Sequence, residues 1–337
     1  MTRLILTADS SSAGCVVSAG LADLAVPIEL RMVWGPPRSD AELAAFLAAR
    51  MRQGPDCHWL DSMPPWRLQK FGMNDLGLIE ACERCETVEL WMETEPNAQL
   101  VLIWLLDHLG ARAKDLGITM RHVDVALGEA EPARLAKSNF MSVAITDDHL
   151  EIASLAWQAH RAPTPHAWYD LLSRDLSILP QLRKCVLEML EELPGCTTGL
   201  GASERRILEL ISAGYEQPFD LFPHFKRRFQ HRVFGYWEAG AILEKLALAP
   251  APAVSGLAEW PFTLEMHNSP ERYEHYKQSR LSLTELGKAI LAGTEDFSRH
   301  NPIDRWWGGT HLTNDRLWRW DPALVKPSHR ESERGAP

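Results

Sequence analysis

The chain has little cysteine, no long apolar run and no excess of positive charge. Its 337 residues include six cysteines, too few and too scattered for a disulfide framework, so a reducing compartment is expected. The most apolar run, 100–106, is far shorter than the roughly 20 residues of a membrane helix. The first residues carry an acid and serines where a signal peptide has an apolar core. We therefore predict a cytoplasmic protein with no membrane partner.

Several familiar signatures of function are also missing. The formal net charge of −10 opposes long-range attraction to nucleic-acid phosphates, although a local basic patch could override it. No Gly-x-Gly-x-x-Gly is present, so the dinucleotide fingerprint is absent, and the sequence names no cofactor. Cys82 and Cys85 form one Cys-x-x-Cys pair with no second pair to complete a zinc site; Cys57-His58 is the only nearby supplement. We predict no metal site.

The N-terminal part alternates apolar runs with helical patterns. The length of the whole chain suits two domains. Strands are predicted at 3–8, 27–33, 87–92 and 118–126. Helices are predicted after the first strand and at 41–52 and 98–109. This alternation is typical of parallel βαβ units, so we predict an α/β fold, a Rossmann-like parallel sheet covered by helices, over residues 1–145.

The rest of the chain is mainly helical. Residues 146–194 have helical periodicity broken by prolines and are predicted to be a connector. Within 195–325, helices are predicted at 202–211, 220–230 and 235–246, followed by a short strand and a helix capped by Thr284. This order predicts a winged-helix-like α+β domain with a tryptophan-rich tail.

Five segments together resemble a family of uncharacterised bacterial two-domain proteins, in which each half is labelled only as a domain of unknown function. They are Leu6-Thr7-Ala8-Asp9-Ser10, Trp34-Gly35-Pro36, Glu89-Leu90-Trp91-Met92, Gly199-Leu200-Gly201-Ala202-Ser203-Glu204 and Arg305-Trp306-Trp307-Gly308-Gly309-Thr310. The chain departs from the family at Ala8, where glycine is usual, and at Met32-Val33, where an acid is usual. The resemblance implies a two-domain fold but no activity.

The loop after the first strand is the leading candidate for a ligand site. Asp9, Ser10 and Ser11 stand where a parallel sheet meets a helix N-terminus, and ligands of open sheets bind beyond the carboxyl ends of strands. A carboxylate at this place disfavours a bound phosphate and suits a ribose or another hydroxyl group, a metal, or a hydrogen-bonding role. The alternative is that these side chains only cap a helix.

A hydrolase interpretation of the same loop is weaker. Ser10 resembles the nucleophile of Gly-Asp-Ser hydrolases, which need a histidine base and an acid in an Asp-x-x-His near the C-terminus. His311 has Gly308 three residues before it, and Asp296 precedes His300 by four residues.

The tail supplies the remaining candidate residues. Adjacent tryptophans and paired glycines predict a segment packed into a groove, either as a structural clamp or as part of a binding site. In the second case Arg305, Trp307 and His311, with Arg38 after the Gly-Pro-Pro turn, would line the mouth of the first domain together with Asp9.

Two functions from different classes follow. The first is binding of, or action on, a nucleotide- or sugar-like anionic small molecule at the N-terminal cleft. The second is a regulatory or protein-interaction module that uses the winged-helix-like domain, with a protein partner or a second copy of the chain. Nucleic-acid binding is disfavoured because the predicted helix 235–246 offers few base-reading side chains, and the basic cluster 226–228 lies one helix earlier.

Overall fold

The structure is a computed structural model that describes residues 2–50, 57–222, 233–257, 262–263, 266, 268–320 and 328–329. The chain divides into two compact units. The first unit comprises Met1–Met32, Pro36–Arg161 and Asp170–Cys185, and the second comprises Val33–Gly35, Ala162–Tyr169 and Val186–Pro337. Residues 146–194, expected as a connector, are therefore shared between the two units.

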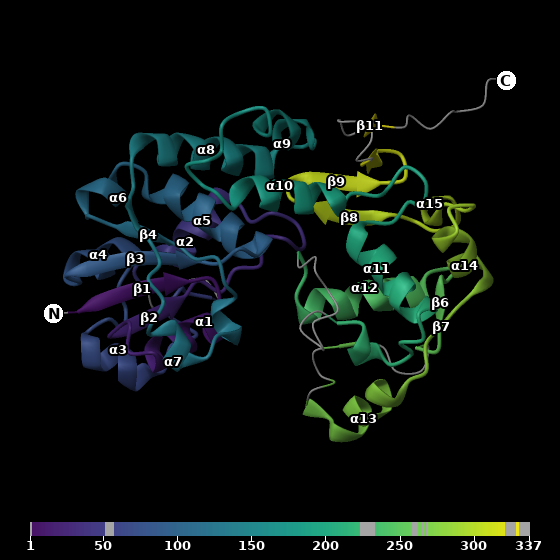
Figure 1. Cartoon of the computed structure of the whole chain (residues 1–337), viewed down its shortest axis with the longest axis horizontal. Helices are drawn as coiled ribbons and strands as arrows, with labels where there is room; N and C mark the ends of the chain where they lie inside the picture. Colours follow the sequence, from purple (N-terminus) through teal and green to yellow (C-terminus); the bar gives the residue numbers. More distant parts are fainter. Residues whose placement is uncertain are drawn as a thin grey trace. The chain divides into compact units, whose positions relative to one another are not determined.

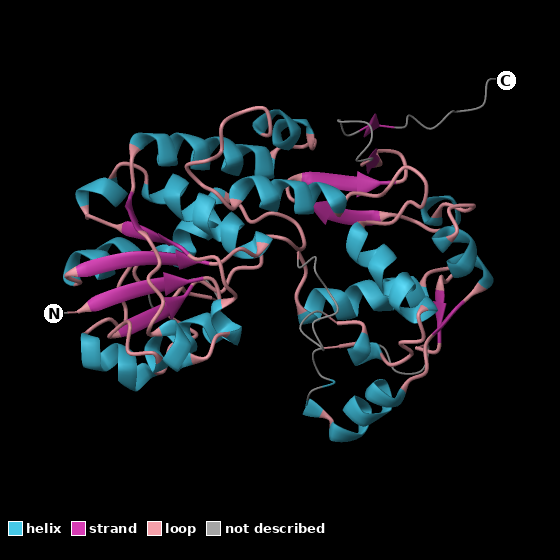
Figure 2. Ribbon diagram, in the orientation of Figure 1, coloured by secondary structure: helices cyan, strands magenta, loops and turns pink. Residues whose placement is uncertain are grey.

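The first unit is built on a five-stranded, mostly parallel sheet (Figure 2). The strands are β1 (Arg3–Thr7), β2 (Leu24–Pro27), β3 (Thr87–Met92), β4 (Thr119–His122) and β5 (Ser142–Ala144). They lie in the order β2-β1-β3-β4-β5, and β5 alone among them runs antiparallel to its neighbour. The predicted α/β class is thus confirmed at the level of a mixed α/β fold.

The predicted strand 27–33 was wrong in its position. The observed strand ends at Pro27, and its partners on β1 run from Leu4 to Thr7. Ile28 still donates its backbone N–H to the Thr7 carbonyl at 2.8 Å, but Thr7 is the last residue of β1, so the ladder ends there although the apolar character of the sequence continues.

Helices cover both faces of this sheet. They are α1 (Ser10–Ser18), α2 (Asp40–Leu47), α3 (Pro65–Phe71), α4 (Leu78–Arg84), α5 (Pro96–Leu109), α6 (Arg112–Asp115), η1 (Leu127–Glu129), α7 (Pro132–Leu135) and α8 (Asp147–Arg161). Helices α1 and α7 pack on one face over Ile5, Ala25 and Trp91. Helix α5 packs beside β3 on the other face and against α8 (Figure 1). Burial of this helix is nearly all-round, which explains its unbroken apolar run.

The second unit combines short helices with two-stranded sheets. Its elements, including two helices that cross a unit boundary, are α9 (His166–Leu171), α10 (Leu182–Glu191), α11 (Ala202–Ser212), η2 (Pro218–Asp220), α12 (Tyr236–Leu248), β6 (Val254–Ser255), α13 (Pro270–Gln278), β7 (Ser282–Leu283), α14 (Glu285–Leu291), α15 (Phe297–His300), β8 (Asp304–Trp307), β9 (Thr310–Thr313), β10 (Trp318–Arg319) and β11 (Ser328–His329). The antiparallel pairs are β6–β7, β8–β9 and β10–β11.

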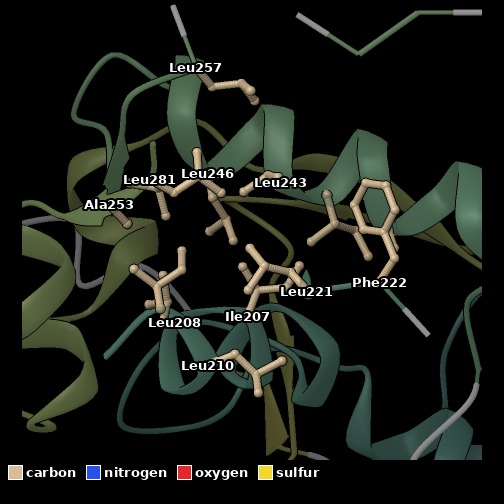
Figure 3. Close-up of a cluster of buried hydrophobic side chains, with 14 of the residues drawn as sticks. Ile207, Leu208, Leu210, Leu221, Phe222, Leu243, Leu246, Ala253, Leu257 and Leu281 are labelled. Atoms are coloured by element: carbon tan, nitrogen blue, oxygen red, sulfur yellow. The ribbon is translucent and has the colours of Figure 1, made fainter. Parts of the chain in front are cut away.

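The core of the second unit lies between α11 and α12 (Figure 3). Ile207 and Leu208 from α11 face Leu243 and Leu246 from α12, and all four are buried. The predicted helices 202–211 and 235–246 are confirmed within two residues at each end. The predicted helix 220–230 lies almost entirely outside the described residues.

Candidate functional site

The first candidate site begins with Asp9, two residues after the end of β1. Asp9 has an extended backbone and is the N-cap of α1: one carboxylate oxygen accepts the backbone N–H of Ser12 at 2.9 Å. The other accepts the Ser12 hydroxyl at 2.6 Å. Asp9 therefore satisfies an orphan donor of the helix and fills the position that a bound anion would take.

Ser12 links Asp9 to a second acid, Glu93, which directly follows β3. The Ser12 hydroxyl lies 2.7 Å from Glu93 Oε1, and the backbone N–H of Leu127 donates to Oε2 at 2.9 Å. Ser12 is fully buried and Glu93 is 5% exposed. The backbone carbonyl of Glu93 also accepts the Gln99 side-chain amide. Glu93 is thus held in place from several directions.

The protonation of this cluster follows from its geometry. Burial raises the pKa of Glu93 to about 8, and the negative charges of Glu95 and Asp9 act in the same direction, against the opposing hydrogen bond from Ser12. The single hydroxyl proton of Ser12 cannot be donated to Asp9 and to Glu93 at once. A neutral Glu93 resolves the conflict by donating its own proton to Ser12, which then donates to Asp9.

The cluster stands at the point where the strand order reverses. From β1 the chain enters β2 on one side and later returns to form β3 on the other. Asp9 and Glu93 follow these adjacent strands, β1 and β3, at their carboxyl ends. In open parallel sheets this crevice is the usual place for a ligand.

Glu93 was missed by sequence reasoning. The available signal was an acid immediately after an apolar strand, in the segment Met92-Glu93-Thr94. Only the parallel register, which aligns Leu6 with Leu90, brings that acid beside Asp9.

The neighbouring serines have structural contacts. Ser10 and Ser11 are both exposed. The Ser10 hydroxyl donates to Glu29, which follows β2. A Cβ added to Gly128 would lie 2.8 Å from Ser11 Cβ, so Ser11 packs closely against the η1 turn. Arg38 is exposed on the first unit, and its guanidinium contacts Cys57 Sγ at 3.5 Å.

The tail candidates lie in the second unit, on the β8–β9 hairpin. Arg305 donates to Glu204 at 2.8 Å and to the Glu192 carbonyl at 3.1 Å. The Trp307 indole is buried and donates to the Met189 carbonyl at 2.6 Å. His311 pairs with Asp304 at 2.7 Å and stacks on Trp306. These hydrogen bonds all join residues of the second unit, so they hold the hairpin within that unit.

The remaining alternatives find little geometric support. Ser10, within the described part of the chain, is hydrogen-bonded to a glutamate and not to a histidine. Asp296 binds Arg319, while His300 binds Glu295.

Burial raises the pKa of Cys82 to about 12 and of Cys85 to about 11, which keeps these thiols protonated. Among the described residues no group of three or more potential metal ligands is found. The basic residues 226–228 lie outside them.

No family model matches the chain, and no curated protein matches it. Among the described residues, no helix is long and apolar enough to cross a membrane. Inferences about function therefore depend on the geometry of the two units.

Proposed function

We propose that the first unit binds a nucleotide- or sugar-like small molecule at the carboxyl edge of its sheet. The observation that carries the proposal is the pairing of Asp9 and Glu93, through Ser12, at the switch point between β1 and β3. The Asp9 carboxylate can accept hydrogen bonds from sugar hydroxyls, while the buried Glu93 holds Ser12 in place behind it. A carboxyl with a pKa near neutrality also suits proton transfer, should a reaction follow binding.

The same charges set the orientation of the ligand. The carboxylate of Asp9 occupies the N-terminus of α1 and repels a phosphate there. In the proposal the hydroxyl-bearing part faces Asp9, and an anionic group points away from it toward exposed Arg38. Participation of Arg305, Trp307 and His311 in this site stays a prediction from the sequence.

A thermal-shift comparison tests the proposal, with ribose, adenosine and uridine diphosphate glucose as probes. Asp9→Asn keeps a capping oxygen but removes the charge, and Ser39→Ala removes the cap of α2 as a matched control. We expect a probe to raise the melting temperature of the wild type and of Ser39→Ala by several degrees at saturation. The shift is expected to disappear in Asp9→Asn. Equal shifts in all three proteins would exclude Asp9 from the site.

The second candidate function is protein interaction through a winged-helix-like C-terminal domain. It is supported by the succession of α11, α12, the β6–β7 pair and α14, and by Trp237 of α12, which is 44% exposed. An exposed tryptophan is a typical interface anchor. We expect Trp237→Glu to abolish the capture of a protein partner by the full chain, whereas Asp9→Asn should still capture it. Capture unaffected by Trp237→Glu would contradict this assignment.

Nucleic-acid binding receives less support. The described helix α12 carries two acids at Glu238 and Glu244 and one base at Lys245. Gel shifts at low salt test this point, and we expect no complex. Membership of the two-domain family and a cytoplasmic location remain predictions; six free cysteines are the state that a reducing compartment maintains.

A further inference from the structure

Two cavities in the second unit are both lined by Lys245. The smaller, about 180 Å³, has an aromatic wall, and the larger, about 440 Å³, has a mostly aliphatic one. Both are lined by Lys245, Asp304 and Arg305, so these side chains form a wall that the two cavities share. The larger volume lies in the range of small-molecule sites.

The wall of the larger cavity is mostly apolar. Its wall includes Ala241, Leu246, Leu248, Pro250, Phe297 and Ile303. Leu248 remains 44% exposed, and Trp306, on the wall of the smaller cavity, 36% exposed. An apolar ligand would cover this surface and gain hydrophobic free energy in proportion to the area removed from water.

Within the described part of the chain, the carboxylates along the walls bind other partners, with the exception of Glu244. Glu204 accepts from Arg305 at 2.8 Å and from the Gly201 N–H at 2.7 Å. Glu192 accepts the Ser203 hydroxyl and backbone N–H, and Asp304 pairs with His311. Glu244 is the exception; burial raises its pKa, so its surroundings disfavour a negative charge there.

Lys245 is a cation on the wall that the two cavities share. Its ammonium lies 5.3 Å from the centre of the Trp34 ring, and within the described residues it has no carboxylate at ion-pair distance. The residue is exposed and thus accessible to a ligand. Although part of the side chain is exposed, desolvation by the protein atoms around the ammonium, followed by the charge of Arg305, lowers the pKa of Lys245, even though Glu204 and Asp304 act in the opposite direction. An incoming anion would stabilise this ammonium.

We propose that the second unit binds an amphipathic organic acid, with its carboxylate at Lys245 and its apolar chain in the larger cavity. This site is separate from the carboxylate cluster of the first unit and does not depend on the proposed function. The head group would gain a charge-assisted hydrogen bond, and the chain would be desolvated against Leu246, Leu248 and Phe297.

Isothermal titration calorimetry with octanoate tests the proposal. Octan-1-ol has the same chain without the charge, and acetate has the head group without the chain. Lys245→Met removes the ammonium and keeps the apolar stem, whereas Lys245→Arg keeps the charge. Lys288→Met is the matched control, since Lys288 lies on α14, pairs with Glu285 and lines neither cavity. Ala241→Phe fills the larger cavity without changing any charge. Melting curves confirm that each variant is folded.

We expect octanoate to bind the wild type, Lys245→Arg and Lys288→Met with similar affinity, and to bind Lys245→Met at least about tenfold more weakly. Ala241→Phe should also weaken the binding of octanoate. Octan-1-ol should bind the wild type more weakly than octanoate does. Its affinity should be the same for the wild type and for Lys245→Met. The proposal is overturned if octanoate shows no saturable binding, if octan-1-ol binds the wild type as tightly, or if Lys245→Met leaves octanoate affinity unchanged.

Discussion

At the scale of single residues, the chemistry of the first unit depends on one hydroxyl group between two acids. Ser12 contacts Asp9 at 2.6 Å and Glu93 at 2.7 Å. Buried polar groups of this kind stabilise a fold only when each donor meets an acceptor. The proton that Glu93 retains near neutral pH completes the set.

Glu93 should make the stability of the protein depend on pH. Its pKa is raised from 4.5 to about 8 in the folded state, so between these values the folded protein holds more protons than the unfolded chain. The free energy of unfolding should therefore fall as pH rises through this window, by up to about 1.4 kcal/mol per pH unit. Glu93→Gln should lose this component of the slope in urea unfolding curves recorded between these pH values.

Glu83→Gln is the control for that measurement, because Glu83 is exposed on α4 and lies outside the cluster. It should retain the wild-type slope. Identical slopes for the wild type and Glu93→Gln would show that Glu93 is ionised across the window.

At the scale of elements, short polar side chains define where helices begin. Thr284 starts α14: its hydroxyl accepts the Gly287 N–H at 3.0 Å and donates to the Pro252 carbonyl at 2.7 Å. This cap was predicted from the sequence, and the structure confirms it, because capping needs only residues a few positions apart.

Loss of the Thr284 hydroxyl should be measurable. We expect Thr284→Ala to lower the free energy of unfolding by about 1 kcal/mol and Thr284→Ser to lower it by less, since serine retains the hydroxyl. Chemical denaturation of the two variants gives the comparison. If both lose the same amount, the methyl group and not the cap stabilises this position.

A buried ion pair holds Arg319, in the described part of the tail. Arg319, on β10, binds Asp296 at 2.8 Å and the Gly195 carbonyl at 2.8 Å, and both charged side chains are less than 10% exposed. Gly199 adopts a φ of +69°, and a Cβ there would lie 2.1 Å from Asp296 Oδ1. This close packing supports a structural role for the segment after β9.

Removal of one partner should therefore be costly. We expect Asp296→Ala to destabilise the protein by about 3–5 kcal/mol, because Arg319 would remain buried without its counter-charge. Glu274→Ala, which breaks an exposed pair with Lys277, should cost less than about 1 kcal/mol. Comparable losses in denaturant titrations would mean that the Arg319 pair is hydrated in solution.

At the scale of the whole molecule, the cysteines report on burial throughout the chain. All six are free thiols; Cys15, Cys82 and Cys185 are buried, and the others are partly exposed. In a thiol titration without reductant, the unfolded protein should yield six thiols per chain. The native protein should react promptly only at Cys57 and Cys196, since burial raises the pKa of the partly exposed Cys85 to about 11 and the other three thiols are buried. Fewer thiols after unfolding would reveal a disulfide.

The sequence by itself determined the features that depend on neighbouring residues. These include the alternation of strands and helices in the first unit, the bounds of β3, and the caps at Asp9 and Thr284. Propensity, periodicity and capping act over a few residues, so they are readable along the chain. The end of β2 was misplaced, because an apolar stretch continues beyond Pro27 and only pairing with β1 shows where the strand stops.

Only the tertiary structure decided which polar groups meet. Ser12 and Glu93 are 81 positions apart, and Arg305 and Glu204 are 101 positions apart. Such contacts arise from parallel strand register and from hairpin packing, and many pairings of the same residue types are equally compatible with the sequence. The same reason applies to Lys245: that no carboxylate of the described residues lies at ion-pair distance from it depends on which partners those carboxylates already bind.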